Sequence, residues 1–136
     1  MPAATTDRNT RRRGSDVRTL PVAANTMIPA GVIAAVNAAG HMVNAGEASA
    51  VRVVGYTQSR SDNTDGVAGT LMHPAWRGVA GPFHTGSGAD QVGAADVGAP
   101  CYVVDNQTVA RVDAGTRLKA GTVWAVEDGG VYVLFD

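Results

Sequence analysis

Histidine is the side chain most often used for metal binding and proton transfer, and this chain of 136 residues holds three: His41, His73 and His84. No two of them stand two or four positions apart. Those spacings would place two imidazoles on one face of a strand or a helix, as a locally built zinc site requires. The sequence therefore predicts no metal site built on histidine.

Cys101 is the single cysteine, so the chain cannot form an intrachain disulfide. It lies in an apolar run, residues 101–104, where we expect a buried and unreactive thiol. A nucleophilic cysteine needs a base held beside it, and the sequence indicates none.

The polar loop 59–66, SRSDNTDG, partly follows the pattern of a calcium-binding loop. The residues at suitable positions are Asn63, Asp65 and Gly66. However, Ser61 stands where the first acidic ligand belongs, and Met72 stands where the bidentate glutamate belongs. The pattern therefore disfavours a calcium site.

The remaining chemical motifs are equally incomplete. Carboxylates are paired only in turn-like segments, as Asp62 with Asp65 and Glu127 with Asp128, where turn formation explains them. The segment 86–88, GSG, is too short for a nucleophile elbow, a phosphate-binding loop or a dinucleotide fingerprint. We expect a protein that is not an enzyme and that uses no cofactor or metal.

Arginine residues are clustered in a polar segment, residues 1–16. The cluster consists of Arg8, Arg11, Arg12 and Arg13. The segment has neither helical nor strand periodicity, which predicts a flexible basic arm. Residues 1–20 hold five arginines and two aspartates, a net charge of +3, while the rest of the chain carries −4. Such an arm suits an acidic protein surface or nucleic acid phosphates, but it lacks the aromatic residues that stack on single-stranded bases.

Three short runs rich in β-branched and aromatic residues, 101–104, 122–126 and 131–135, predict the strands that close the core. An Asp-Gly pair joins the last two runs, which predicts a β-hairpin. Alternation along these runs leaves apolar residues on both faces rather than on one. Val131, Val133 and Phe135 share one face. The residues predicted for the other face, and hence for an interface between subunits, are Trp124, Val126, Tyr132 and Leu134. The alternative is a closed barrel whose outer face is covered by its own loops.

The rest of the chain indicates more short strands, since 17 glycines and 6 prolines divide it frequently. We expect an edge strand over 17–22, a strand and turn over 27–31, strands over 32–36 and 41–43, and a strand over 51–56 with a bulge at Gly55. An interrupted strand is predicted over 71–83, and a helix over 30–39 is the competing prediction. The predicted fold is all-β, a small turn-rich β-barrel or β-sandwich formed by one domain, 17–136, after the arm. We expect no membrane span and no secretory signal.

Three segments carry a resemblance to a known family: VVGYTQSRSDNTDG (53–66), AADVGAPCYVVDNQTVA (94–110) and AGTVWAVEDGGVYVLF (120–135). They resemble the small capsid cement, or head decoration, proteins of tailed bacteriophages. The resemblance covers roughly residues 17–136, and its motifs are structural rather than catalytic. The arm matches no motif of that family.

This resemblance implies a structural virion protein that binds the outer surface of the phage head. It implies the major capsid protein and further copies of the chain as partners, with trimers at three-fold and quasi-three-fold positions of the lattice. Two alternatives remain open on the residues alone. One is a nucleic-acid-binding module that uses the arginine-rich arm, and the other is a different virion component, such as a head-fibre base or tail subunit. A small barrel enzyme or ligand binder would need converging polar groups, which the sequence does not provide.

Overall fold

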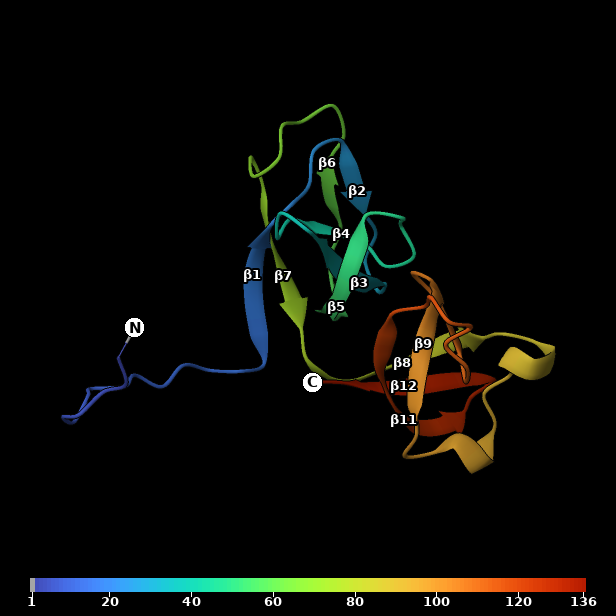
Figure 1. The fold of residues 1–136 in the computed structure, drawn as a ribbon. Coiled ribbons are helices and arrows are strands. Elements are labelled where there is room, and N and C mark those ends of the chain that lie inside the picture. The colour runs from blue at the N-terminus through green and yellow to red at the C-terminus, as the bar shows by residue number, and fades with distance from the viewer. Residues whose placement is uncertain (1) are drawn as a thin grey trace.

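The computed structural model describes residues 2–136 and is built almost entirely from strands, which hold 47% of the residues (Figure 1). Its only helical elements in that range are two short 3-10 turns, η1 (Gly88–Asp90) and η2 (Ala94–Asp96). The predicted all-β fold class is therefore confirmed. No helix within residues 2–136 has the length and apolar character needed to cross a bilayer.

The first half of the chain forms an antiparallel five-stranded sheet with the order β1-β7-β5-β3-β4. Its strands are β1 (Val17–Pro21), β3 (Ile33–Asn37), β4 (Met42–Asn44), β5 (Ala50–Tyr56) and β7 (Met72–Trp76). A separate two-stranded sheet pairs β2 (Thr26–Ile28) with β6 (Ser61–Asn63). The edge position predicted for the strand with Pro21 is confirmed, because β1 pairs only with β7. An edge strand accommodates proline, because backbone groups on its outer side pair with no other strand and the missing N–H of proline breaks no hydrogen bond there.

The second half forms a closed barrel with the order β10-β8-β12-β11-β9. Its strands are β8 (Gly78–Thr85), β9 (Pro100–Asp105), β10 (Thr108–Ala110), β11 (Lys119–Glu127) and β12 (Gly130–Phe135). Short parallel pairing of β10 with β8 closes the ring, whereas the other pairs are antiparallel. Closure removes the exposed edges that an open sheet of this size would present.

The predicted hairpin between the last two strands is also confirmed. Asp128 and Gly129 both have positive φ, 56° and 75°, as a two-residue turn matching the twist of paired strands requires. The β3–β4 hairpin depends on Asn37, whose Oδ1 accepts hydrogen bonds from the backbone N–H groups of Ala39 and His41. Since β3 occupies residues 33–37, the helix considered over 30–39 is wrong.

One predicted loop contains a strand. Residues 61–63 of the polar stretch 59–66 form β6, and both Ser61 and Asn63 are buried in it. The Asn63 amide donates to the carbonyls of Ala23 and Val67, so a polar side chain satisfies the backbone here. Polarity in this segment reflects internal hydrogen bonding and gave no strand signal.

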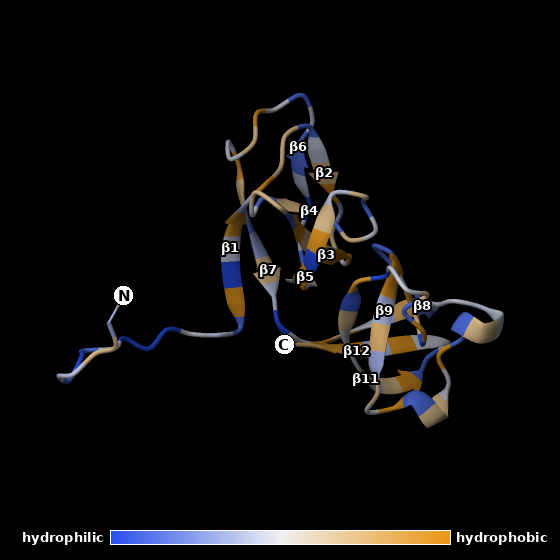
Figure 2. Ribbon diagram, in the orientation of Figure 1, coloured by the Kyte–Doolittle hydropathy of each residue, from blue (hydrophilic) through white to orange (hydrophobic). Residues whose placement is uncertain are grey.

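Buried residues of the sheet and of the barrel form one hydrophobic cluster. Figure 2 shows apolar residues along strands of both halves. Ile33 and Ala35 of β3 belong to the same buried cluster as Phe83 and Val131 of the barrel. The rings of Tyr56 and Phe135 cross the junction with centroids 5.6 Å apart. A second cluster lies within the sheet half. Its members are Val22, Ile28, Val32, Ala34, Val36, Met42, Val54 and Ala75.

The predicted arm covers residues 1–16, and residue 1 lies outside the described residues. Residues 2–15 contain no strand or helix, and all of them are exposed. The arm leaves the foot of β1 and extends away from the body (Figure 1). Arg77, the one residue between β7 and β8, holds the end of the arm that joins β1. The Arg77 backbone N–H donates to the Asp16 carbonyl at 2.8 Å, and its Nη1 donates to the Ser15 carbonyl at 3.2 Å.

Candidate interaction surface

The outward faces of β8, β12 and β11 form an apolar strip on the barrel. Leu134 pairs with Val79 on one side and with Thr122 on the other, so these side chains lie in one row. Val79 is 41% exposed and Trp124 is 57% exposed, while Leu134 and Tyr132 are partly exposed. We call the set Val79, Trp124, Tyr132 and Leu134 the outer barrel face. It includes three of the four residues predicted for a subunit interface.

The fourth predicted interface residue, Val126, lies elsewhere. The pairing of β11 with β12 shifts by one residue between Val123 and Ala125, so Trp124 is the extra residue of a β-bulge. A bulge reverses the inside–outside alternation of the residues that follow it. Val126 therefore pairs with the buried Val131 and packs against the barrel core. The predicted common face for Trp124 and Val126 is wrong for this reason.

A further apolar side chain borders the outer barrel face. Val97, which is 52% exposed, follows η2. The adjoining backbone is bonded to β11, because Gly98 N–H donates to the Val123 carbonyl and Val123 N–H donates to the Ala99 carbonyl. This fixes the segment 97–99 beside the bulge at Trp124 and extends the apolar surface in that direction.

Charged groups at the margins of the barrel pair with each other. Arg117 makes two hydrogen bonds to the Asp90 carboxylate, at 2.9 and 3.0 Å, and this contact lowers the pKa of Asp90. Arg111 lies 3.4 Å from Asp96. The Tyr132 hydroxyl donates to the Asp128 carboxylate, which raises the pKa of Tyr132. These pairs hold the connections around the barrel and leave the centre of the outer barrel face apolar.

The arginines of the arm stand apart from this face. Arg8, Arg11, Arg12 and Arg13 are exposed, and neither of the two ion pairs formed within residues 2–136 involves them. In Figure 1 the arm points away from the barrel. The structure thus gives the molecule two separate exposed features, a basic arm and an apolar face.

The chemically reactive residues are dispersed in space as they are in sequence. Within residues 2–136 no three His, Cys, Asp or Glu side chains come together as metal ligands would. His73 is buried and its Nε2 lies 2.9 Å from the Ser59 carbonyl. Cys101 is fully buried, as predicted, and burial raises its pKa to about 11, which keeps the thiol protonated. The Asp62 carboxylate accepts two hydrogen bonds from Thr64, which lower its pKa and fit the predicted role in a turn.

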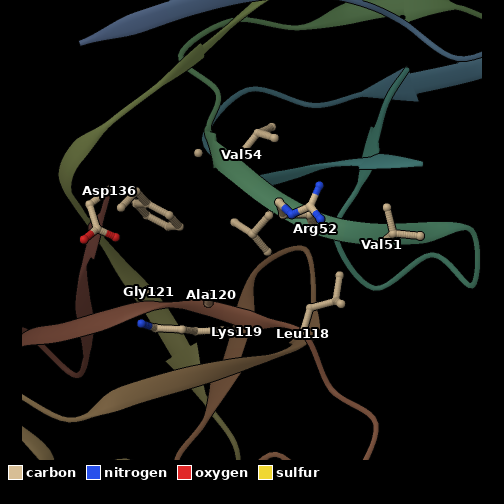
Figure 3. A pocket seen from close by; sticks show the side chains of 11 residues that line it. Val51, Arg52, Val54, Leu118, Lys119, Ala120, Gly121 and Asp136 are labelled. Atoms are coloured by element: carbon tan, nitrogen blue, oxygen red, sulfur yellow. The ribbon is translucent and has the colours of Figure 1, made fainter. Parts of the chain in front are cut away.

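Sequence reasoning also missed a groove of about 330 Å³ where the sheet meets the barrel (Figure 3). One wall is the segment 51–55 of β5, and the other is the segment 118–121 at the start of β11. Phe135 and Asp136 close one end. No pattern in the sequence indicates this groove, because it depends on how two distant segments approach each other.

Comparison with models of known families, with curated proteins and with solved structures gives no match for this chain.

Proposed function

We propose that this chain is a structural virion protein: a capsid decoration, or cement, protein that binds the outer surface of a phage head and stabilises the lattice of the major capsid protein. The outer barrel face is the observation that carries the proposal. An apolar row that includes a tryptophan more than half exposed is typical of a surface that another protein covers. The resemblance of residues 53–66, 94–110 and 120–135 to head decoration proteins names the kind of partner.

Copies of the chain are the partners proposed for the outer barrel face. Trp124 is well suited to anchor such a contact, since aromatic residues contribute strongly at the centre of interfaces. Stable interfaces bury on the order of 1,200–2,000 Å² in total. A homotrimer would spread this area over three equivalent contacts, and it matches the symmetry of three-fold and quasi-three-fold positions on a capsid.

The arm is proposed to contact the capsid. Sixteen extended residues reach roughly 50 Å, far beyond the body they leave. Exposed ion pairs are individually worth only about 0–1 kcal/mol, so the four arginines of the arm would act together with backbone contacts. Arginine suits this role because its planar fork makes two hydrogen bonds to one carboxylate.

Reconstitution on heads tests the proposal. Purified heads that lack the protein are mixed with the full chain or with the Trp124→Ser variant, and bound copies are counted by electron microscopy. We expect the full chain to add density at three-fold positions and to raise the temperature at which heads rupture. The Trp124→Ser variant should bind with fewer contacts between copies. Heads that gain neither density nor thermal resistance from the full chain would refute the proposal.

The arginine cluster supports a second candidate, a nucleic-acid-binding module. Binding through Arg8, Arg11, Arg12 and Arg13 would weaken steeply with salt, because each neutralised phosphate releases counterions. A gel shift of duplex DNA at low salt separates the two functions. Tight binding that disappears between low and moderate salt, together with failure to decorate heads, would favour the nucleic-acid module.

A further inference from the structure

The groove between sheet and barrel runs along the edge of a strand. Residues 51–55 of β5 all line it, consecutively, and so do residues 118–121 of β11. A groove over the face of a strand would be lined by alternate residues, because successive side chains point to opposite faces. Consecutive lining residues place the backbone itself in the wall. In Figure 3 the two segments run side by side with the groove between them.

On the groove side, β5 pairs with a neighbouring strand only at its last residue. β5 pairs with β7 at a single position, Tyr56 with Trp76, after which β7 leads away into the barrel. The Val54 carbonyl on this edge accepts a hydrogen bond from Arg18 Nη2 at 3.2 Å. At this position a side chain, rather than the backbone of another strand, is the partner. The Ala45 N–H donates to the Ile33 carbonyl and the Asn37 N–H donates to the His41 carbonyl, so the backbone groups of Val36, between them, turn to β5 and to its partner Arg52. The N–H and C=O of Val53, the next residue of β5, therefore face the groove. An unpaired edge of this kind is a template for an added strand.

The groove also carries a distinct pattern of charge. Arg52 and Lys119 are exposed on its walls, and Asp136 lies at one end. None of the three takes part in the ion pairs found within residues 2–136. An extended segment that carries an acidic residue next to a basic one would complement these charges.

We propose that this groove binds residues 3–10 of the arm from a second copy of the chain, which adds to β5 as an extra strand. The segment reads AATTDRNT. Thr5, Thr6 and Thr10 favour extended backbone, and the segment has no glycine or proline to interrupt pairing. In this arrangement Asp7 lies opposite the cations Arg52 and Lys119.

The position of the arm root favours a second copy over the arm's own body. Arg77 holds the carbonyls of both Ser15 and Asp16, so the arm is directed outward where it leaves β1. Figure 1 shows the arm extending away from β5 and the barrel. Each copy then donates one arm and accepts another. Such head-to-tail contacts close into a ring when the rotation between copies allows it. This inference concerns copies of the chain and does not depend on the proposed capsid.

Cross-linking of full-length chains tests the arm exchange. A chain with Thr6→Cys is mixed at high concentration with an isotope-labelled chain carrying Val51→Cys, and a short bismaleimide joins thiols that come close. Cys101 does not compete, because it is fully buried. The control acceptor carries Val67→Cys, on a loop of the sheet half away from the groove. Val67 is 74% exposed and Val51 is 46% exposed, so random collision favours the control.

We expect several-fold more mixed dimer with Val51→Cys than with Val67→Cys, measured by mass spectrometry. An equal or smaller yield would overturn the proposal. A single chain carrying both Thr6→Cys and Val51→Cys, treated at high dilution, should remain without an internal link. An internal link there would show that the arm folds onto its own body, which also overturns it.

Charge reversal tests the occupant independently of the linker. A Lys119→Glu substitution in the Val51→Cys acceptor should lower the yield of mixed dimer, because the introduced carboxylate would repel Asp7 of the donor. Adding Asp7→Lys to the donor chain should restore the yield. If neither change alters the yield, the arm does not lie against this wall and the assignment is overturned.

Discussion

Gly55 determines how closely β5 and β7 approach at the only point where they pair. Its φ is +147°, and a Cβ at this position would lie 2.3 Å from the Trp76 carbonyl oxygen. The sequence predicted a bulge or a close backbone approach here, and both are present, because the β3–β5 register shifts beside Gly55. Without that contact the edge of β5 would separate fully from β7.

Replacing Gly55 by alanine should destabilise the fold by about 1–3 kcal/mol, since it adds both a clash and a disfavoured backbone conformation. The matched control is Gly93→Ala. Gly93 has an ordinary extended backbone, and a Cβ there would meet no atom closer than 4.0 Å. Urea unfolding curves of the two variants measure the difference. Equal midpoints for the two would contradict the close approach.

The Asp90–Arg117 pair makes the stability of the barrel margin dependent on pH. The hydrogen bonds from Arg117 hold the pKa of Asp90 below its ordinary value of 3.8. A carboxyl whose pKa is lower in the folded state contributes stability above pH 3.8, and this contribution is lost as the pH falls through the folded-state pKa.

We therefore expect Asp90→Asn to lower the free energy of unfolding at pH 7 and to have little effect in strong acid. Denaturant titrations at several pH values measure both. The matched control, Asp7→Asn in the exposed arm, should leave the free energy of unfolding unchanged throughout. A deficit for Asp90→Asn that persists in strong acid would show that the pair acts through packing rather than charge.

Among the elements, the strands that sequence predicted best are those bounded by strong turn signals. The Asp-Gly turn at 128–129 fixed the last hairpin, and Pro21 indicated an edge. The bulge at Trp124 gave no signal, because residues 122–126 are apolar on both faces and the pattern does not change at position 124. Only the pairing of β11 with β12 shows that Trp124 is an extra residue. Without that information, the prediction placed Val126 on the wrong face of the strand. β6 was missed because its residues are polar. The buried Asn63 side chain makes its hydrogen bonds inside the protein, so the segment lacks the apolar residues that predict a strand.

The bulge predicts losses of stability that differ in size for Trp124 and Val126, the residues on either side of Ala125. Trp124→Ser should change the free energy of unfolding by less than about 0.5 kcal/mol, because the side chain is exposed. Val126→Ser should lower it by about 1–2 kcal/mol, because Val126 packs against the barrel core. Thermal unfolding of both variants measures this. Equal losses would mean that the two residues share one environment, as alternation without a bulge requires.

For the whole molecule, closure of the barrel and the joint core with the sheet could not be predicted from local patterns. Closure depends on parallel pairing of β10 with β8, and the joint core depends on β3 meeting the barrel across many residues of sequence. The groove beside β5 follows from that same meeting. Trp124, Tyr132 and Leu134 remain predicted interface residues, and the arginines remain predicted capsid contacts.

Deleting residues 2–13 should shift the melting temperature by less than about 2 °C, because the structure places this segment entirely outside the core. Scanning calorimetry of dilute protein measures the shift. Extending the deletion to residue 15 removes the Ser15 carbonyl bound by Arg77 and should cost slightly more. A large shift for the shorter deletion would mean that the arm stabilises its own body. If heads retain the shorter chain as tightly as the full chain, the arm is not a capsid contact.

The attachment of the arm to β1 determines how the protein carries mechanical force. A pull on the arm reaches the body through β1, which is paired antiparallel with β7 at five successive residues. When the pull follows the axis of β1, these hydrogen bonds are loaded together in shear and must break at once. When it is perpendicular, they open one after another from Val17. The hold of Arg77 on Ser15 and Asp16 reinforces the end where such peeling would begin, so the protein should resist tension along β1 far better than across it.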